Sequence, residues 1–260
     1  MKTVSDAGSL KRGVVLLKLL ATAGARGLGL SDLAAKSQLP HPSVHRLLGQ
    51  LAAERLAIHN SETRRYKLGP LAFELGVAGS TMHDIRDLCE PAMNALASET
   101  GDTIYLVVRS GFDAVCMHRR EGEFPIRALV LEVGSRRPLG VGAGGLAILS
   151  AIGDEERAEI IARVAPSLPA FGKLTASDLA RACEQSREAG AAVIQNRVSL
   201  GVRAVGVAFK DSMGQAIGAL SVAALTQRLN QRRTHQVAGM LQDASRAVET
   251  LMRKRSSVFV

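Results

Sequence analysis

Apolar residues recur every three or four positions in the first third of the chain, which is the spacing of helices with one buried face. From Ser9 this spacing is kept by four residues, Leu10, Val14, Leu17 and Leu20. A glycine-rich stretch then ends the predicted helix. A second, shorter helix is predicted to begin at Ser31, a candidate N-cap, and to end at Leu39. The pattern therefore predicts two helices before residue 40.

A third helix is predicted to begin near Pro42, a residue that suits a first helical turn. Its apolar face is formed by Val44, Leu47, Leu48 and Leu51. Two short strands are predicted after it, one around Ile58 and one around Tyr66 and Leu68, with a polar turn between them. This order is typical of a winged helix-turn-helix, although a short helix, a turn and a second helix also occur in ordinary helical packing.

Polar residues at the start of the third helix are of the kinds that contact phosphates and base edges in a major groove. The candidates there are His41, Ser43, Val44, His45 and Arg46. Two further candidates lie earlier in the chain, Arg12 in the first helix and Ser31 in the second. On the predicted wing, Arg64 and Arg65 are candidates for contacts with a minor groove or with phosphates. Together these residues predict a surface that binds double-stranded DNA.

The positive charge is concentrated in the same part of the chain. The formal net charge is +9 and the pI is about 10.0. Residues 1–80 contain 11 Lys and Arg against 5 Asp and Glu, whereas residues 81–260 contain 22 against 19. A solvated basic surface would give the same count, but combined with the helices and the wing the charge favours a polyanionic partner.

The remaining two thirds of the chain predict a second domain. The length of 260 residues favours two folding units, and we place them at 1–80 and 81–260, with a helical connector at the joint. Strands are predicted at 103–108, 114–118, 126–132, 191–195, 204–209 and 216–224. Helices are predicted at 154–165, 177–189 and 231–254, after one that ends before Gly101. Runs of strands separated by helices indicate an α+β fold.

A glycine-rich stretch from Gly134 to Leu149 is the best candidate for a ligand site in this domain. Its glycines at 140, 142, 144 and 145 precede a helix, where backbone N–H groups favour an anion such as a carboxylate. A tightly packed turn between a strand and a helix would need the same glycines. Leu129 and Leu131, which alternate along the predicted strand before this stretch, are candidates for an apolar wall.

The first third resembles the N-terminal domain of the isocitrate lyase regulator (IclR) family almost position by position. The resemblance is carried by Leu10 and Arg12, Leu30 to Ala34, Leu39 to Leu48, and Tyr66 to Gly69. Beyond residue 80, the order of elements is similar to the GAF-like α/β effector-binding domain of that family. The stretch from Gly134 also resembles a family block, with Leu146 in place of the usual Lys.

The resemblance implies a transcriptional regulator, repressor or activator, whose operator affinity responds to a small-molecule effector. By that match the effector pocket would be lined by Gly142, Ala143, Asn196, Ala204, Ser221 and Ala223. Asn196 stands near a position that is often acidic in the family. Ala204 stands where Cys is frequent in the family, and Ala223 where a small polar residue is frequent. We therefore expect a more apolar pocket and an organic or aromatic acid. The family also implies a homodimer or homotetramer.

The sequence leaves two other classes of function to consider, an enzyme and an architectural DNA-binding protein. An enzyme would need a catalytic motif, but no H-E-x-x-H, nucleophile elbow, P-loop or dinucleotide-binding motif is present, and no cofactor or metal site is expected. A DNA-binding dimer with a purely architectural role remains an alternative. The three cysteines lack metal-ligand spacing, and no apolar run is long enough for a membrane span. We expect a cytoplasmic protein with no membrane partner.

Overall fold

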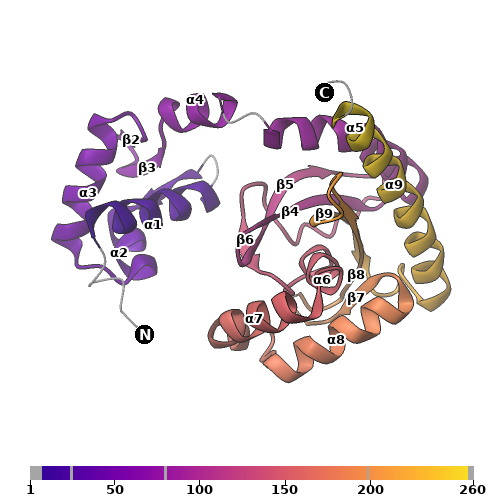
Figure 1. Ribbon diagram of the computed structural model, residues 1–260. Helices are drawn as coiled ribbons and strands as arrows, with labels where there is room; N and C mark the ends of the chain where they lie inside the picture. Colours follow the sequence, from indigo (N-terminus) through magenta and orange to yellow (C-terminus); the bar gives the residue numbers. More distant parts are fainter. Residues whose placement is uncertain (1–7, 24–25, 79–80, 198, 257–260) are drawn as a thin grey trace. The chain divides into compact units, whose positions relative to one another are not determined.

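Two units, Met1–His83 and Asp84–Val260, make up the chain in the computed structural model, which describes residues 8–23, 26–78, 81–197 and 199–256. Each unit has a hydrophobic core of its own. Figure 1 shows their helices and strands with the labels used below. The α+β class predicted from the sequence is therefore confirmed.

The first unit consists of helices followed by a small sheet. Its helices are α1 (Ser9–Thr22), α2 (Leu30–Ser37), α3 (His41–Ala53) and α4 (Pro70–Ala78), and its strands are β1 (Leu28–Gly29), β2 (Ala57–Asn60) and β3 (Arg65–Leu68). The three strands form an antiparallel sheet in the order β1-β3-β2. The helix-turn-helix and the two-stranded wing are confirmed, and β1, which has only two residues, is an addition that no periodicity signals.

The core of this unit corrects the predicted apolar face of α1. Leu16 and Leu20 are buried in it, whereas Leu10 is 83% exposed and Val14 is 39% exposed. The segment is apolar at nearly every position from Val14 to Leu20, so spacing alone did not decide which face turns inward. On α3 the predicted face is confirmed, since Val44, Leu47 and Leu48 are all buried.

The start of α2 also differs from the prediction. Gly29 is the N-cap, and the carboxylate of Asp32 accepts a hydrogen bond from its N–H at 3.3 Å. This contact satisfies one of the N–H groups that the end of a helix leaves without a helical partner. Ser31 is consequently an exposed residue inside the first turn and not the cap.

The second unit is built on one six-stranded antiparallel sheet in the order β6-β5-β4-β9-β8-β7. The strands are β4 (Thr103–Ser110), β5 (Asp113–Arg120), β6 (Arg136–Pro138), β7 (Ala192–Gln195), β8 (Val202–Lys210) and β9 (Ala216–Leu225). The helices are α5 (Thr81–Thr100), α6 (Ala143–Ser150), α7 (Asp154–Val164), α8 (Ala176–Ala189) and α9 (Gln231–Ser256), with the 3-10 helix η3 (Ala165–Ala170) between α7 and α8.

Alternation along the central strands gives the sheet two apolar faces. On β4, Ile104 and Leu106 pack on one side with residues of α5 and α9, while Tyr105 and Val107 pack on the other side with residues of α6. Figure 1 shows α5 and α9 along one face and α6 against the opposite face. Both faces are covered, so the central strands are apolar at nearly every position.

The segment 126–132 is not the strand that the sequence predicted. Its backbone is held by side chains instead: the Tyr105 hydroxyl donates to the carbonyl of Ala128 at 2.7 Å and accepts from the N–H of Val130 at 3.0 Å. Arg119 donates to the carbonyl of Leu131 at 3.3 Å. Because these contacts satisfy the backbone groups that a neighbouring strand would otherwise pair, the segment crosses the sheet face as an irregular wall.

Gly206 on β8 allows α6 to approach the sheet. A Cβ at this position would lie 2.5 Å from the carbonyl oxygen of Ala143, which belongs to the first turn of α6. We expect Gly206→Ala to lower the free energy of unfolding by about 1–3 kcal/mol, because a backbone contact this short forces the helix away from the strand. Chemical denaturation followed by circular dichroism measures the change.

Gly239→Ala in α9 provides the matched control. A Cβ there has no neighbour within 4 Å, and alanine is the better helix former, so stability should rise by about 0.5–1 kcal/mol. Equal stabilities of Gly206→Ala and the wild type would contradict the packing of α6 on β8.

In the part of the chain that the structure describes, no helix is long and apolar enough to span a membrane.

Candidate nucleic-acid interface and ligand cavity

The outward side of α3 carries the residues predicted to read DNA. His41, His45 and Arg46 are exposed and Ser43 is half-buried. Val44 is fully buried in the core between the helices, so the prediction that it contacts DNA is wrong. Its function is to fix α3 on the domain, since a buried face is what holds a reading helix in place. The helix therefore presents two imidazoles and one guanidinium on its exposed surface.

On the wing, the two predicted arginines have different positions. Arg64 is exposed in the turn between β2 and β3, with a φ of 54°. The amide oxygen of Asn60 accepts from the N–H of Thr63 at 2.7 Å and shapes this turn. Arg65 is the first residue of β3, and its guanidinium donates to the carbonyl of Gly27 at 3.0 Å. Arg64 thus belongs to the tip of the wing, whereas Arg65 also ties β3 to the segment before β1.

The two remaining candidates lie outside these two elements. Arg12 is half-buried in α1, and Ser31 is exposed near the start of α2. Helices α1 and α2 both pack against α3 through the shared core. The structure does not place either residue on α3 or on the wing.

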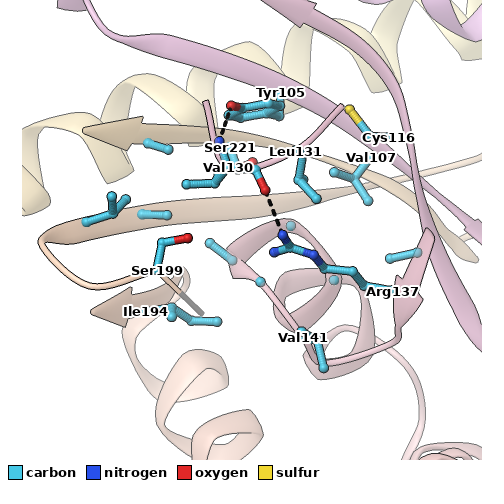
Figure 2. A pocket seen from close by; sticks show the side chains of 18 of the residues that line it. Tyr105, Val107, Cys116, Val130, Leu131, Arg137, Val141, Ile194, Ser199 and Ser221 are labelled. Carbon is cyan, nitrogen blue, oxygen red and sulfur yellow. Dashed lines mark hydrogen bonds between the residues drawn. The ribbon is translucent and has the colours of Figure 1, made fainter. Parts of the chain in front are cut away.

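A cavity lies in the second unit between the inner face of the sheet and the first turn of α6 (Figure 2). Its empty space, counted together with the part that is open to solvent, is about 630 Å³. Its apolar lining comes from five strands, from the wall at 126–132 and from the segment before α6. The apolar side chains are Val107, Ala114, Cys116, Val130, Leu131, Val141, Ile194, Val202, Ala204 and Ala223.

Small residues on two adjacent strands account for the empty space. Ala204 on β8 pairs with Ala223 on β9, and both line the cavity. Larger side chains at these paired positions would fill the space that α6 leaves against the sheet. The cavity is therefore a consequence of small residues at facing positions.

Ser221 is a polar side chain inside this apolar lining. It is 5% exposed, and a Cβ at Gly144 in the first turn of α6 would lie 3.6 Å from its hydroxyl oxygen. Among the described residues, none forms a hydrogen bond with this hydroxyl. Gly142, the N-cap of α6, has a φ of 82°, a conformation that L residues rarely adopt. A buried hydroxyl and the amino end of a helix thus meet at one point of the cavity.

Arg137 on β6 also lines the cavity, although no motif in the sequence marked this residue. Its guanidinium donates to the carbonyl of Val130 at 2.6 Å, the contact drawn in Figure 2. Burial lowers the pKa of Arg137, because removal from water disfavours the cation. Burial raises the pKa of Cys116 to about 11 and also raises that of Tyr105, so both of these groups are neutral at pH 7.

Comparisons with known proteins bear on both sites. Residues 78–250 match the family described as bacterial transcriptional regulator IclR C-terminal, and residues 9–61 match the IclR helix-turn-helix domain. The chain belongs to the IclR family. The resemblance found in the sequence is thereby confirmed, and the protein is a transcriptional regulator with a DNA-binding domain of that family.

Curated relatives and solved structures of the IclR family agree over nearly the whole chain. The HTH-type transcriptional repressor AllR of Escherichia coli strain K12 is 27% identical over 95% of this chain and 90% of its own length. An IclR regulator from Alicyclobacillus acidocaldarius has a TM-score of 0.75 at 20% identity, covering 94% of this chain and 98% of its own. These relatives are transcriptional regulators and are not described as enzymes.

A third relative contains an aromatic acid. The IclR homologue from Microbacterium hydrocarbonoxydans, solved in complex with 4-hydroxybenzoate, has a TM-score of 0.73 at 22% identity, covering 95% of this chain and all of its own. At that identity the likeness shows the IclR fold alone.

The residues that the IclR resemblance marked for the effector lie around the cavity. They are Gly142, Ala143, Asn196, Ala204, Ser221 and Ala223, and Leu131, which was expected from the alternation of its segment, lines the cavity as well. Leu129 was also expected in the wall but is 53% exposed and does not line the cavity, because the segment is not a strand and its side chains do not alternate between two faces. The amide oxygen of Asn196 is occupied by the N–H of Gly201 at 2.9 Å, so this residue also shapes its own loop.

Proposed function

We propose that this IclR-family regulator binds an operator through α3 and the wing and that a small organic acid in the cavity changes its affinity for that operator. The observation that carries this proposal is Ser221, a buried hydroxyl without a hydrogen-bond partner in the described part of the chain, beside the amino end of α6. Because this hydroxyl lines the cavity and forms no hydrogen bond with the described residues, it is available to pair with a polar group of a ligand.

The chemistry of the lining supports an acid with an apolar body. The amino end of a helix favours a negative group, and the paired alanines on β8 and β9 leave room for apolar atoms. An aromatic acid satisfies both requirements, and one IclR homologue of the same fold contains 4-hydroxybenzoate.

The proposed assembly is a symmetric homodimer or homotetramer with a domain boundary near residue 80. Two copies of α3 would then enter major grooves of a pseudo-palindromic operator. The effector would act through a coupling free energy of about 1–3 kcal/mol between its own site and the DNA site.

A screen of small acids, read by thermal shift and by gel shift, tests the proposed function. A ligand at a hundred times its Kd stabilises the native state by about 2.7 kcal/mol, so a binding acid should raise the Tm of the effector domain by several degrees. The same acid should change operator affinity by about 5- to 150-fold. If no acid affects either quantity, the protein is a ligand-independent, architectural DNA-binding regulator.

A further inference from the structure

Arg137 differs from the arginines near it in having no acidic partner. Arg136, the preceding residue, forms an ion pair with Asp113 at 3.0 Å, and Arg119 on β5 forms one with Glu121 at 2.9 Å. Arg137 forms no ion pair with any described residue, and its one hydrogen bond within the described part of the chain goes to a backbone carbonyl. A half-buried cation has thus been placed on the cavity side of β6 without a counter-charge.

The rest of the lining does not supply that charge. None of the described residues around the cavity carries a carboxylate, and a second arginine, Arg197, is also among the lining residues. Cys116 and Tyr105 are neutral at pH 7, as described above. A buried charge is costly unless it is paired, so the cavity as a whole favours a negatively charged occupant.

The guanidinium also lies close to the amino end of α6. Its Nη1 atom is 3.9 Å from the position that a Cβ at Gly142 would take, while its Nη2 atom donates to Val130. A guanidinium has five N–H donors in a planar fork, so the contact with Val130 leaves others available. Arg137, the amino end of α6 and the Ser221 hydroxyl therefore surround the same end of the cavity.

We propose that Arg137 binds the carboxylate of the effector and thereby restricts this cavity to anions with an apolar body. This inference rests on the proposed effector site and deepens it. A guanidinium pairs with a carboxylate through two parallel hydrogen bonds, which a neutral amide or alcohol cannot reproduce. The apolar side chains beyond it accommodate a ring or a branched chain.

The same guanidinium connects the bound acid to one wall of the cavity. Val130, whose carbonyl accepts from Arg137, belongs to the segment that Tyr105 holds across the sheet face (Figure 2). A carboxylate bound by Arg137 would therefore contact the same guanidinium that holds the wall at 126–132 through Val130. An anion in the site then affects the hydrogen bond between Arg137 and this wall.

Isothermal titration of the full-length protein with benzoate, cyclohexanecarboxylate and the neutral isostere benzamide tests the proposal. We expect the wild type to bind at least one of the two acids at least about tenfold more tightly than benzamide, because hydrogen bonds to charged groups are the stronger ones. Arg137→Gln should bring the affinity for that acid to the level of benzamide. Arg137→Lys, which keeps the charge but not the fork, should retain part of the preference.

Arg136→Gln is the matched control, since it removes an adjacent arginine that does not line the cavity, and its preference for acids should equal that of the wild type. An unchanged Tm without ligand shows that each variant is folded. If Arg137→Gln keeps the full preference for acids, the role of Arg137 is overturned while the proposed effector site stands. If the wild type binds neither acid at millimolar concentration, the anion-selective cavity itself is overturned.

Discussion

Arg46→Ala is expected to weaken operator binding by about 1–3 kcal/mol, which corresponds to a loss of affinity of about 5- to 150-fold. Arg46 is exposed on α3, on the side opposite to the buried Val44, Leu47 and Leu48. A guanidinium on such a helix binds either a guanine edge or a phosphate, and its truncation removes a charge-assisted contact. A gel-shift titration at fixed salt, on an operator selected from random duplexes with the purified protein, measures the effect.

The salt dependence of the same titration separates the two kinds of contact. Loss of a phosphate contact reduces the slope of log K against log salt by about 0.9 and weakens all sequences alike, whereas loss of a base contact relaxes specificity at one position. Arg163→Ala in α7 is the control, because it removes one cation from the other unit. Equal operator affinity of Arg46→Ala and the wild type would show that α3 is not the reading helix.

Ser221→Leu is expected to abolish the response to the effector and to leave operator affinity without ligand unchanged. Leucine at this position projects into the space between β9 and the first turn of α6, where the hydroxyl of Ser221 now lies near Gly144. It removes the unpaired hydroxyl and fills the end of the cavity that we assign to the carboxylate. The acid that shifts the wild type in the thermal and gel-shift assays should produce no shift in this variant.

A second variant makes this result independent of strain at Ser221. Overpacking a buried site costs about 1–3 kcal/mol, so the Tm of Ser221→Leu without ligand is measured in parallel. Ala204→Leu fills the cavity from β8, where the residue is only half-buried and has more room. A full effector response in both variants would contradict the placement of the effector in this cavity.

Local patterns predicted most of the elements correctly. The apolar face of α3 follows from spacing, because a buried face imposes the period of the helix that carries it, and the apolar runs that became β4, β8 and β9 were also predicted as strands. The same reasoning was right only in part on α1, where the predicted Leu20 is buried, but Leu10 is exposed and the unpredicted Leu16 is buried. A segment that is apolar at nearly all positions has no period from which its inner side can be read.

The candidate site was predicted in part and for a different reason. The resemblance to the IclR family marked six residues that the structure brings to one cavity, among them Gly142 and Ser221. Arg137 was not marked, since the sequence contains no pattern that distinguishes it from the identical residue Arg136 beside it. A signal was present only in the alternation of β6, which sends two adjacent arginines to opposite sides of the strand.

The sequence by itself determined the winged helix-turn-helix, with its basic charge and its exposed Arg46, and the family to which the chain belongs. These properties depend on neighbours within a few residues of one another. Only the tertiary structure decided that Val44 is buried, that the segment 126–132 is a wall held by Tyr105, and that Arg137 faces an apolar cavity without an acid. The residues that contact Val44, the wall and Arg137 lie on other helices and strands. For the wall and the cavity they lie on other strands and on α6, so they meet only when the chain has folded.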